Sequence, residues 1–94
     1  MITTKTKLRF NSNNRKEILQ TVYRLSELDL KSKGCLKAEV LKDVRDKNIL
    51  YLVEEWSSDK DMEKHNQSKS MAVLCGLQFL LVEDLQTIHT FRWA

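Results

Sequence analysis

Residues 49–66 read ILYLVEEWSSDKDMEKHN, and this stretch decides the fold. The first eight residues form two alternating rows, and both rows are largely apolar. Such a pattern is typical of a strand at the centre of a sheet that is covered on both faces. Ser58 then begins a helix, and two aspartates follow in its first turn, where the helix dipole favours acidic side chains. The stretch therefore predicts a central strand over residues 49–56 that leads directly into a helix.

The chain before this stretch predicts a strand and a long helix. In residues 2–10, a row of apolar and threonine side chains alternates with a row that is mostly basic, which indicates a strand with one buried face. Residues 15–30 follow helical spacing, and Asn14 with Glu17 resembles a capping box at the start of this helix. Gly34 supplies the left-handed turn that ends it. The inner face of the helix is expected to carry Ile18, Val22, Leu25 and either Leu28 or Asp29.

The remaining elements complete the fold. Residues 36–40 alternate as a second strand, and the polar residues 43–48 form the turn into the central strand. A second helical piece is expected over residues 71–79, and a last strand over residues 82–92. The order is β-α-β-β-α-β, so we predict an α+β fold of the ferredoxin-like type, with a four-stranded antiparallel sheet and both helices on one face.

The second face of the sheet requires a cover, because the central strand is apolar on both sides. A second copy of the sheet is the simplest cover, since most soluble oligomers are two-fold dimers. We therefore expect a homodimer. The row of Lys5, Lys7 and Arg9 fits this expectation least well, because it lies on the face opposite the helices and must either reach the rim or leave that face partly open.

Composition restricts the class of protein. Ninety-four residues make one domain, residues 1–94, and no apolar run approaches the ~20 residues of a membrane span. Residues 1–47 carry 12 basic and 6 acidic side chains, but no aromatic residues interleave with the basic strand, so nucleic acid is not an expected partner. Two isolated cysteines, Cys35 and Cys75, and the lack of a signal sequence favour a cytoplasmic location. No histidine or cysteine has zinc spacing, so no metal is expected.

Residues 54–68, EEWSSDKDMEKHNQS, carry a resemblance to a known family. A strand ends in Glu-x-Trp, a capped helix begins, and a histidine follows nine residues after the tryptophan. With the order of strands and helices, this pattern resembles the antibiotic biosynthesis monooxygenase family of the dimeric α+β barrel superfamily. The resemblance implies that two protomers pack sheet against sheet and that each holds a pocket between its sheet and its helices. Characterised relatives oxidise aromatic polyketides without flavin or metal, degrade haem, or process quinones and small signalling molecules.

His65 and Glu54 are the candidate catalytic residues. His65 should look toward the sheet, where it could act as a pocket base or brace the strand below it. Glu54 shares a strand face with Trp56, and its inward carboxyl group needs a partner such as His65. The Glu54–His65 pair could relay a proton, or it could be a structural link between sheet and helix.

Four aromatic or histidine side chains are the candidate substrate-binding residues: Trp56, Tyr51, His89 and Phe91. Trp56 could form a pocket wall, or it could be ordinary core packing. His89 and Phe91 share a row of the last strand with Trp93, and this row could line a pocket or a dimer seam, or simply pack.

These residues lead to alternative functions. The first is a cofactor-independent oxidoreductase of the monooxygenase type, acting on a small aromatic or quinol-like molecule. The second is a non-catalytic dimeric domain that binds a small molecule or serves in a stress response. Haem degradation is the minor alternative, because the haem-degrading relatives place an asparagine within the first strand, whereas here Thr4 and Thr6 occupy the strand interior and Asn11 lies at its end.

Overall fold

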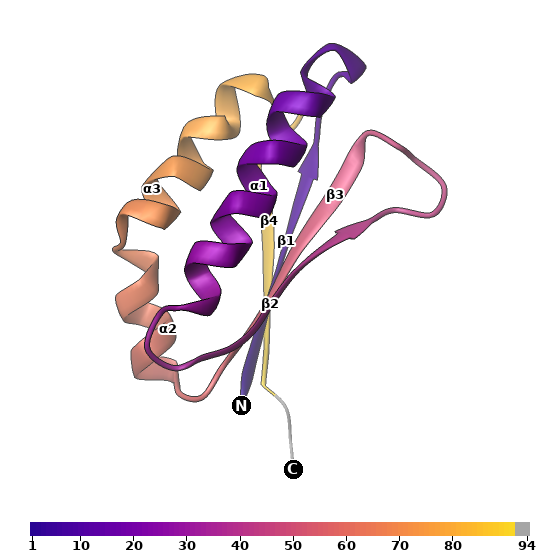
Figure 1. Ribbon diagram of the computed structural model, residues 1–94. Helices are drawn as coiled ribbons and strands as arrows, with labels where there is room; N and C mark the ends of the chain where they lie inside the picture. The colour runs from indigo at the N-terminus through magenta and orange to yellow at the C-terminus, as the bar shows by residue number, and fades with distance from the viewer. Residues whose placement is uncertain (92–94) are drawn as a thin grey trace.

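The computed structural model describes residues 1–91 and has the predicted order of elements, shown in Figure 1. The helix predicted after Ser58 and the further helical piece predicted over residues 71–79 are both present, as two helices in succession, and two short 3-10 turns accompany the longer elements. The elements are β1 (Ile2–Arg9), η1 (Ser12–Asn14), α1 (Arg15–Leu30), β2 (Cys35–Lys42), β3 (Ile49–Trp56), α2 (Asp59–Asn66), α3 (Lys69–Gly76), η2 (Leu77–Leu80) and β4 (Gln86–Phe91).

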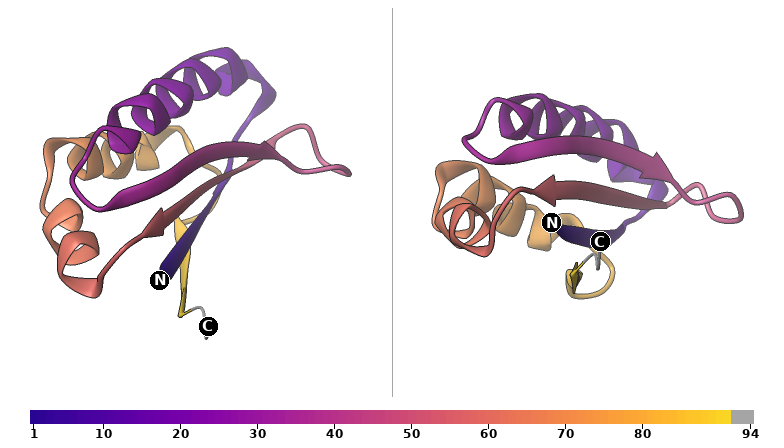
Figure 2. Two further views of the ribbon diagram at one scale, coloured as in Figure 1. Left: turned by 60° about the horizontal axis from the view of Figure 1, so that its bottom comes forward. Right: turned by 90° about the horizontal axis from the view of Figure 1, so that it is seen from below.

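The sheet is antiparallel and four-stranded, with the order β2-β3-β1-β4. The predicted α+β, ferredoxin-like fold is therefore confirmed, and β3 lies inside the sheet, as its two apolar rows indicated. The helices lie on one side of the sheet (Figure 2). Alternate residues of β1 and β3 are buried beneath them, because successive side chains of a strand point to opposite faces.

The core lies between this sheet face and the helices. Its main cluster contains buried aliphatic side chains from β1, α1 and β3 and the ring of Phe10 just after β1, joined by one leucine of α3 and one of η2. A smaller cluster of Ile2, Trp56 and Met62 closes one end of the layer, and Cys35 packs against it. The main cluster consists of Leu8, Phe10, Ile18, Val22, Leu25, Leu50, Leu52, Leu74 and Leu77.

The start of α1 differs from the prediction. Asn14 makes no side-chain capping bond, so the capping box with Glu17 is wrong. A capping side chain normally projects from an extended residue. Asn14 instead ends the turn η1, with φ −101° and ψ 1°, and its N–H donates to the carbonyl oxygen of Asn11 at 3.0 Å. The turn therefore replaces the side-chain cap as the entry to the helix.

The last strand begins at Gln86 rather than at residue 82. The backbone before it is held by the side chain of Gln78, whose Oε1 accepts from the Leu85 N–H at 3.2 Å and whose Nε2 donates to Asp84 Oδ1 at 3.1 Å. These bonds take residues 83–85 out of the sheet although their sequence alternates. The predicted end of the strand at Arg92, and Trp93 beyond it, lie outside the described residues.

The sheet face opposite the helices carries the basic row of β1, as predicted. Lys5 Nζ lies 4.4 Å from the centre of the Tyr51 ring, and Lys7 Nζ lies 3.7 Å from Glu83 Oε1. The charged heads thus bend toward neighbouring side chains. Exposed apolar residues share this face, among them Leu41 and Ile88. Within residues 1–91, the helices are all too short or too polar to cross a membrane.

Candidate functional site

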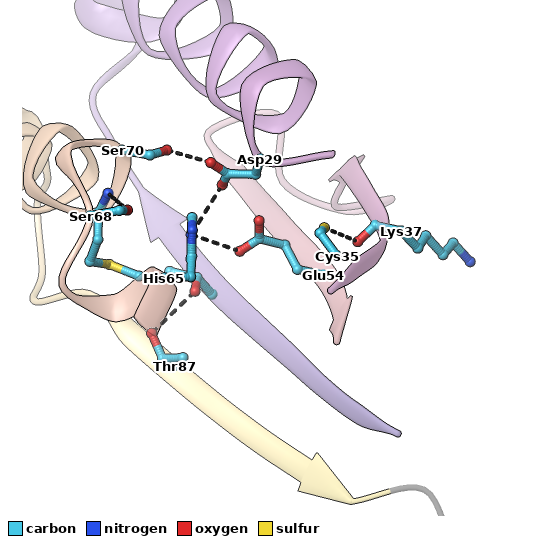
Figure 3. A network of polar contacts seen from close by, with 10 residues as sticks. Asp29, Cys35, Lys37, Glu54, His65, Ser68, Ser70 and Thr87 are labelled. Atoms are coloured by element: carbon cyan, nitrogen blue, oxygen red, sulfur yellow. Dashed lines mark hydrogen bonds and ion pairs between the residues drawn. The ribbon is translucent and has the colours of Figure 1, made fainter. Parts of the chain in front are cut away.

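Three ionisable side chains from three different elements meet in the buried layer. Asp29 comes from the last turn of α1, Glu54 from β3 and His65 from α2. His65 Nε2 lies 3.4 Å from Asp29 Oδ2 and 3.9 Å from Glu54 Oε1. Figure 3 shows the imidazole facing both carboxyl groups. Because each of the three residues is at most 6% exposed, water cannot stabilise their charges, and they must stabilise one another.

Local sequence patterns bring the three residues together. Glu54 alternates with Leu52 and Trp56 on the helix-facing side of β3. His65 follows Met62 by three residues in α2, so both point from the helix toward the sheet. Asp29 follows Leu25 by four residues on the buried face of α1. The alternation of the strand and the spacing of the two helices therefore direct all three side chains to the same place in the core.

The protonation of the two carboxyl groups differs. Burial raises the pKa of Glu54 to about 9, and the hydrogen bond to Asp29 and its negative charge add to the shift. Burial also acts to raise the pKa of Asp29, but hydrogen bonds with His65, Glu54 and Ser70 outweigh it and hold that pKa below its ordinary value. At neutral pH the cluster therefore contains a carboxylic acid at Glu54 and a carboxylate at Asp29.

Two further residues hold the cluster in place. The Ser70 hydroxyl, near the start of α3, donates to Asp29 Oδ1. The Trp56 ring lies against the imidazole of His65, with ring centroids 4.6 Å apart and planes inclined by 33°. Two buried polar atoms, Glu54 Oε2 and Trp56 Nε1, have no hydrogen-bond partner among the described residues. A buried carboxyl oxygen without a hydrogen-bond partner lowers the free energy of unfolding. Such groups are often found at functional sites.

Cavities near the surface of the described residues include a smaller one and a larger one. The smaller one, of about 430 Å³, lies between α2 and β4 and is lined by Ile2, Asp59, Met62, His89 and Thr90. The larger one, of about 1240 Å³, is an open groove along the outer face of α1, bordered by basic side chains such as Arg24 and Lys31. His65 and Trp56 line neither cavity. The smaller cavity nevertheless touches their surroundings, because Ile2 and Met62 pack in one cluster with Trp56.

The structure brings only some of the predicted site residues together. His65, Glu54 and Trp56 are neighbours, and His89 lines the smaller cavity. Tyr51 lies on the other face of the sheet, where its hydroxyl donates to Asp43 Oδ2 at 3.1 Å. Tyr51 therefore cannot share a pocket with Trp56 within one chain. Phe91 pairs with Ile2 at the end of β4.

Asp29 is the member of the cluster that sequence reasoning did not assign to the site. Helical spacing left its position open between Leu28 and Asp29, and the structure buries Asp29 while Leu28 is 49% exposed. One signal was available. A carboxylate on the inner face of a helix is costly, and in the last turn the helix dipole also disfavours it. Such a residue indicates a cationic or proton-donating partner across the core.

The same cluster is where the described residues could most readily hold a small cation. One donor atom from each of Asp29, Glu54 and His65 lies within 4.8 Å of the others. The site is fully buried and already contains a proton at Glu54, which balances part of its negative charge. The expectation that the chain needs no metal or other cofactor stays a prediction.

Comparison with known proteins places this chain in a family. The family model described as "Antibiotic biosynthesis monooxygenase" matches residues 1–74, a stretch that includes Asp29, Glu54 and His65. No curated protein matches the sequence.

Solved structures share the fold over the whole chain. A provisionally named antibiotic biosynthesis monooxygenase from Deinococcus radiodurans has a TM-score of 0.92 at 18% identity, covering 100% of this chain and 94% of that one. A second, from Nitrosomonas europaea, has a TM-score of 0.91 at 13% identity and covers both chains completely. A Bacteroides thetaiotaomicron protein described as of unknown function and a possible oxidoreductase has a TM-score of 0.81 at 20% identity, covering 95% and 96%.

At these identities the structural matches establish the fold alone. The family model spans more than half of the chain and extends through the cluster to Leu74. The chain belongs to the antibiotic biosynthesis monooxygenase family.

Proposed function

We propose that this protein is a cofactor-independent oxidoreductase that uses dioxygen to oxidise a small aromatic or quinol-like molecule. The observation that carries the proposal is the buried cluster of Asp29, Glu54 and His65. Two carboxyl groups and an imidazole in a dry layer stabilise a fold less well than apolar residues of similar size would. Perturbed ionisable groups of this kind are concentrated at sites that move protons.

The smaller cavity supports the same proposal. Its volume of about 430 Å³ lies within the range of small-molecule sites, and two apolar side chains, Ile2 and Met62, form much of its wall. His89 supplies a group that can exchange a proton with a bound hydroxyl. Trp56 lies behind this wall, where it separates the cavity from His65 and keeps the cluster dry.

The proposed chemistry needs a base and a pocket but no bound metal or flavin. The substrate loses a hydroxyl proton to the protein, and the resulting anion donates an electron to dioxygen. With a hydroquinone, two electrons and two protons pass to dioxygen, so that the products are a quinone and hydrogen peroxide. With a substrate that carries an activated methylene carbon, one oxygen atom enters at that carbon and the other leaves as water with its two hydrogens. His89 would contact the substrate, while His65, beside the already protonated Glu54, would hold the added proton during the reaction.

Replacing His65 by glutamine tests the proposal. His65→Gln keeps a hydrogen-bonding side chain between the two carboxyl groups but cannot hold a proton. We expect oxygen uptake with a naphthohydroquinone, corrected for uncatalysed oxidation, to fall by about 100-fold or more. Asn66→Gln, at the exposed neighbouring position, is the matched control. Circular dichroism and thermal melting establish that each variant is folded, and equal rates in wild type and His65→Gln would sink the role of His65.

A non-catalytic binding domain is the second candidate, and one observation favours it. His65 is 6% exposed and lines neither cavity, so a ligand in the smaller cavity would not touch it in this conformation. In that case a naphthohydroquinone would raise the melting temperature without oxygen uptake above background. Haem is a separate ligand to try, and an unchanged Soret band on titration would exclude haem binding.

We also propose that the protein is a homodimer that packs through the sheet face opposite the helices. Tyr51 and Val53 of the inner strand β3 are half-buried on this face, and Leu41 and Ile88 lie exposed beside them. Within the described chain, no helix covers these side chains. A second copy of the same face would remove their apolar surface from water.

A further inference from the structure

A row of polar side chains connects the smaller cavity with the buried cluster. Thr4 of β1 pairs in register with His89 of β4 on one side and with Glu54 of β3 on the other. Paired residues of antiparallel strands place their side chains on the same face, with Cβ atoms about 4.5–5.5 Å apart. His89, Thr4 and Glu54 therefore form one line across the helix-facing side of the sheet.

The two ends of this line differ in their access to water. His89 is exposed and lines the cavity, whereas Thr4 and Glu54 are only 6% and 4% exposed. Glu54 Oε2 has no hydrogen-bond partner among the described residues. The buried end thus has a carboxyl oxygen free to accept or release a proton, and the open end has an imidazole that solvent and ligands can reach.

We propose that the Thr4 hydroxyl is the bridge through which protons pass between His89 at the cavity and Glu54 in the buried cluster. A hydroxyl can accept one proton while it donates another, which is what a bridge requires. The N–H bond of a protonated His89 breaks as Thr4 Oγ1 takes that proton, and Thr4 releases its own proton to the unpartnered Oε2 of the Glu54 carboxyl group. Where Glu54 already carries a proton, it passes that proton on to His65, whose Nε2 lies 3.9 Å from Glu54 Oε1. One ordered water molecule can span any remaining gap without changing this balance.

Neighbouring rows of the sheet do not offer the same connection. Thr6, the next inward residue of β1, pairs with Thr87 and Leu52, and its hydroxyl is already hydrogen-bonded to that of Thr87 at 3.2 Å. Ile2, on the other side of Thr4, pairs with Trp56 and has no hydroxyl. Thr4 thus has both a titratable neighbour at the cavity and one in the core, and Thr6 is its matched control.

The groups around Glu54 are consistent with a proton held there. Asp29 of α1 and His65 of α2 face its carboxyl group. Cys35 of β2 is also near, but burial and then the charge of Glu54 raise the pKa of its thiol to about 11, so it stays protonated across the range in which Glu54 titrates. The proton that enters through Thr4 therefore settles among Glu54, His65 and Asp29.

The inference rests on the proposed function for its purpose, since a substrate proton would enter at His89, but its test needs no substrate. A pH jump across the pKa of Glu54, about 9, should change the infrared band of its protonated carboxyl group, and Glu54→Gln identifies that band. In Thr4→Val we expect the band to respond at least about tenfold more slowly than in wild type. Thr4→Ser should restore the rate, and Thr6→Val should leave it unchanged.

Two outcomes would overturn the bridge. The first is a wild-type rate in folded Thr4→Val, and the second is an equal slowing in Thr6→Val. His89→Gln provides an independent variant should Thr4→Val not fold. It should slow the response of the Glu54 infrared band, because it removes the titratable group at the cavity end of the line. Absence of oxygen uptake in the wild-type protein would contradict the proposed function. It would not affect the test of the bridge, because the infrared rates are measured without a substrate.

Discussion

Glu54 is held in the core by neighbours that favour its neutral form. The residue is 4% exposed, and burial together with Asp29 raises the pKa of its carboxyl group from 4.5 to about 9. The folded protein therefore binds a proton at Glu54 that the unfolded chain has released at the same pH. By proton linkage, this group lowers the free energy of unfolding as the pH rises from about 5 to 9.

We predict that Glu54→Gln removes this pH dependence. Glutamine resembles the protonated acid and cannot ionise, so between the unfolded pKa and a pH of about 9 the variant should gain on the wild type by up to about 1.4 kcal/mol for each unit of pH. Urea unfolding at a series of pH values between slightly acidic and alkaline would measure the effect. Glu55→Gln, on the opposite sheet face, should retain the wild-type slope. Parallel curves for wild type and Glu54→Gln would contradict the raised pKa.

Asp29 shows what a residue-scale reading of the sequence can and cannot predict. Helical spacing narrowed the inner position to Leu28 or Asp29, and an apolar residue is the ordinary occupant of a core. The choice depends on His65 and on Ser70, which is 41 residues away and donates to Asp29 Oδ1. No local pattern contains that information, whereas the inward direction of Glu54 and Trp56 followed from strand alternation alone.

At the scale of the elements, the turn between α1 and β2 is fixed by Gly34. Its φ of +83° lies in the left-handed region that favours glycine. A side chain here would also collide with Asp61, because an added Cβ would lie 2.3 Å from its Oδ2. Asp61 accepts hydrogen bonds from the hydroxyls of Ser57 and Ser58 at the start of α2, so it cannot move away freely. Gly34, which follows α1 in the chain, therefore packs directly against the first turn of α2.

We predict that Gly34→Ala destabilises the protein by about 1–3 kcal/mol, through the positive φ and the contact with Asp61. Gly76→Ala is the matched control, because an added Cβ there meets no atom within 4 Å in the described part of the chain. This second variant should be neutral or stabilise by up to about 1 kcal/mol, since alanine favours a helix more than glycine does. Urea unfolding of both variants compares them, and equal effects would exclude the specific role of Gly34.

The elements that the sequence predicted well are those whose pattern is repeated along their length. Both apolar rows of β3 extend over eight residues, and the inner row of β1 alternates without a break. The errors lie at ends of elements. The capping box failed because a 3-10 turn precedes α1, and β4 begins late because the Gln78 side chain binds the backbone before it. Element ends depend on such single contacts, which periodicity does not contain.

At the scale of the whole molecule, the sheet has one covered and one open face, as Figure 2 shows. The open face is less charged than its sequence indicates. Lys37 lies 3.2 Å from Glu39 and 3.7 Å from Glu55, and Lys5 lies over the Tyr51 ring. Within the basic row of β1 itself, Lys7 lies 3.7 Å from Glu83, so a second sheet on this face would meet fewer unpaired charges than the sequence alone indicates.

Val53 lies near the middle of the open face, because it pairs with Lys5 on one side and with Glu39 on the other. We predict that Val53→Lys converts a dimer into a monomer. A lysine there would bury a charge against the partner's sheet, yet it points away from the core of its own chain. Val44→Lys is the control, since Val44 is 97% exposed in the turn between β2 and β3. Sedimentation equilibrium should give twice the 11.1 kDa chain mass for wild type and Val44→Lys, and a single chain mass for Val53→Lys. A wild-type mass of one chain at micromolar concentration would refute the dimer, and a Val53→Lys dimer would move the interface to another surface.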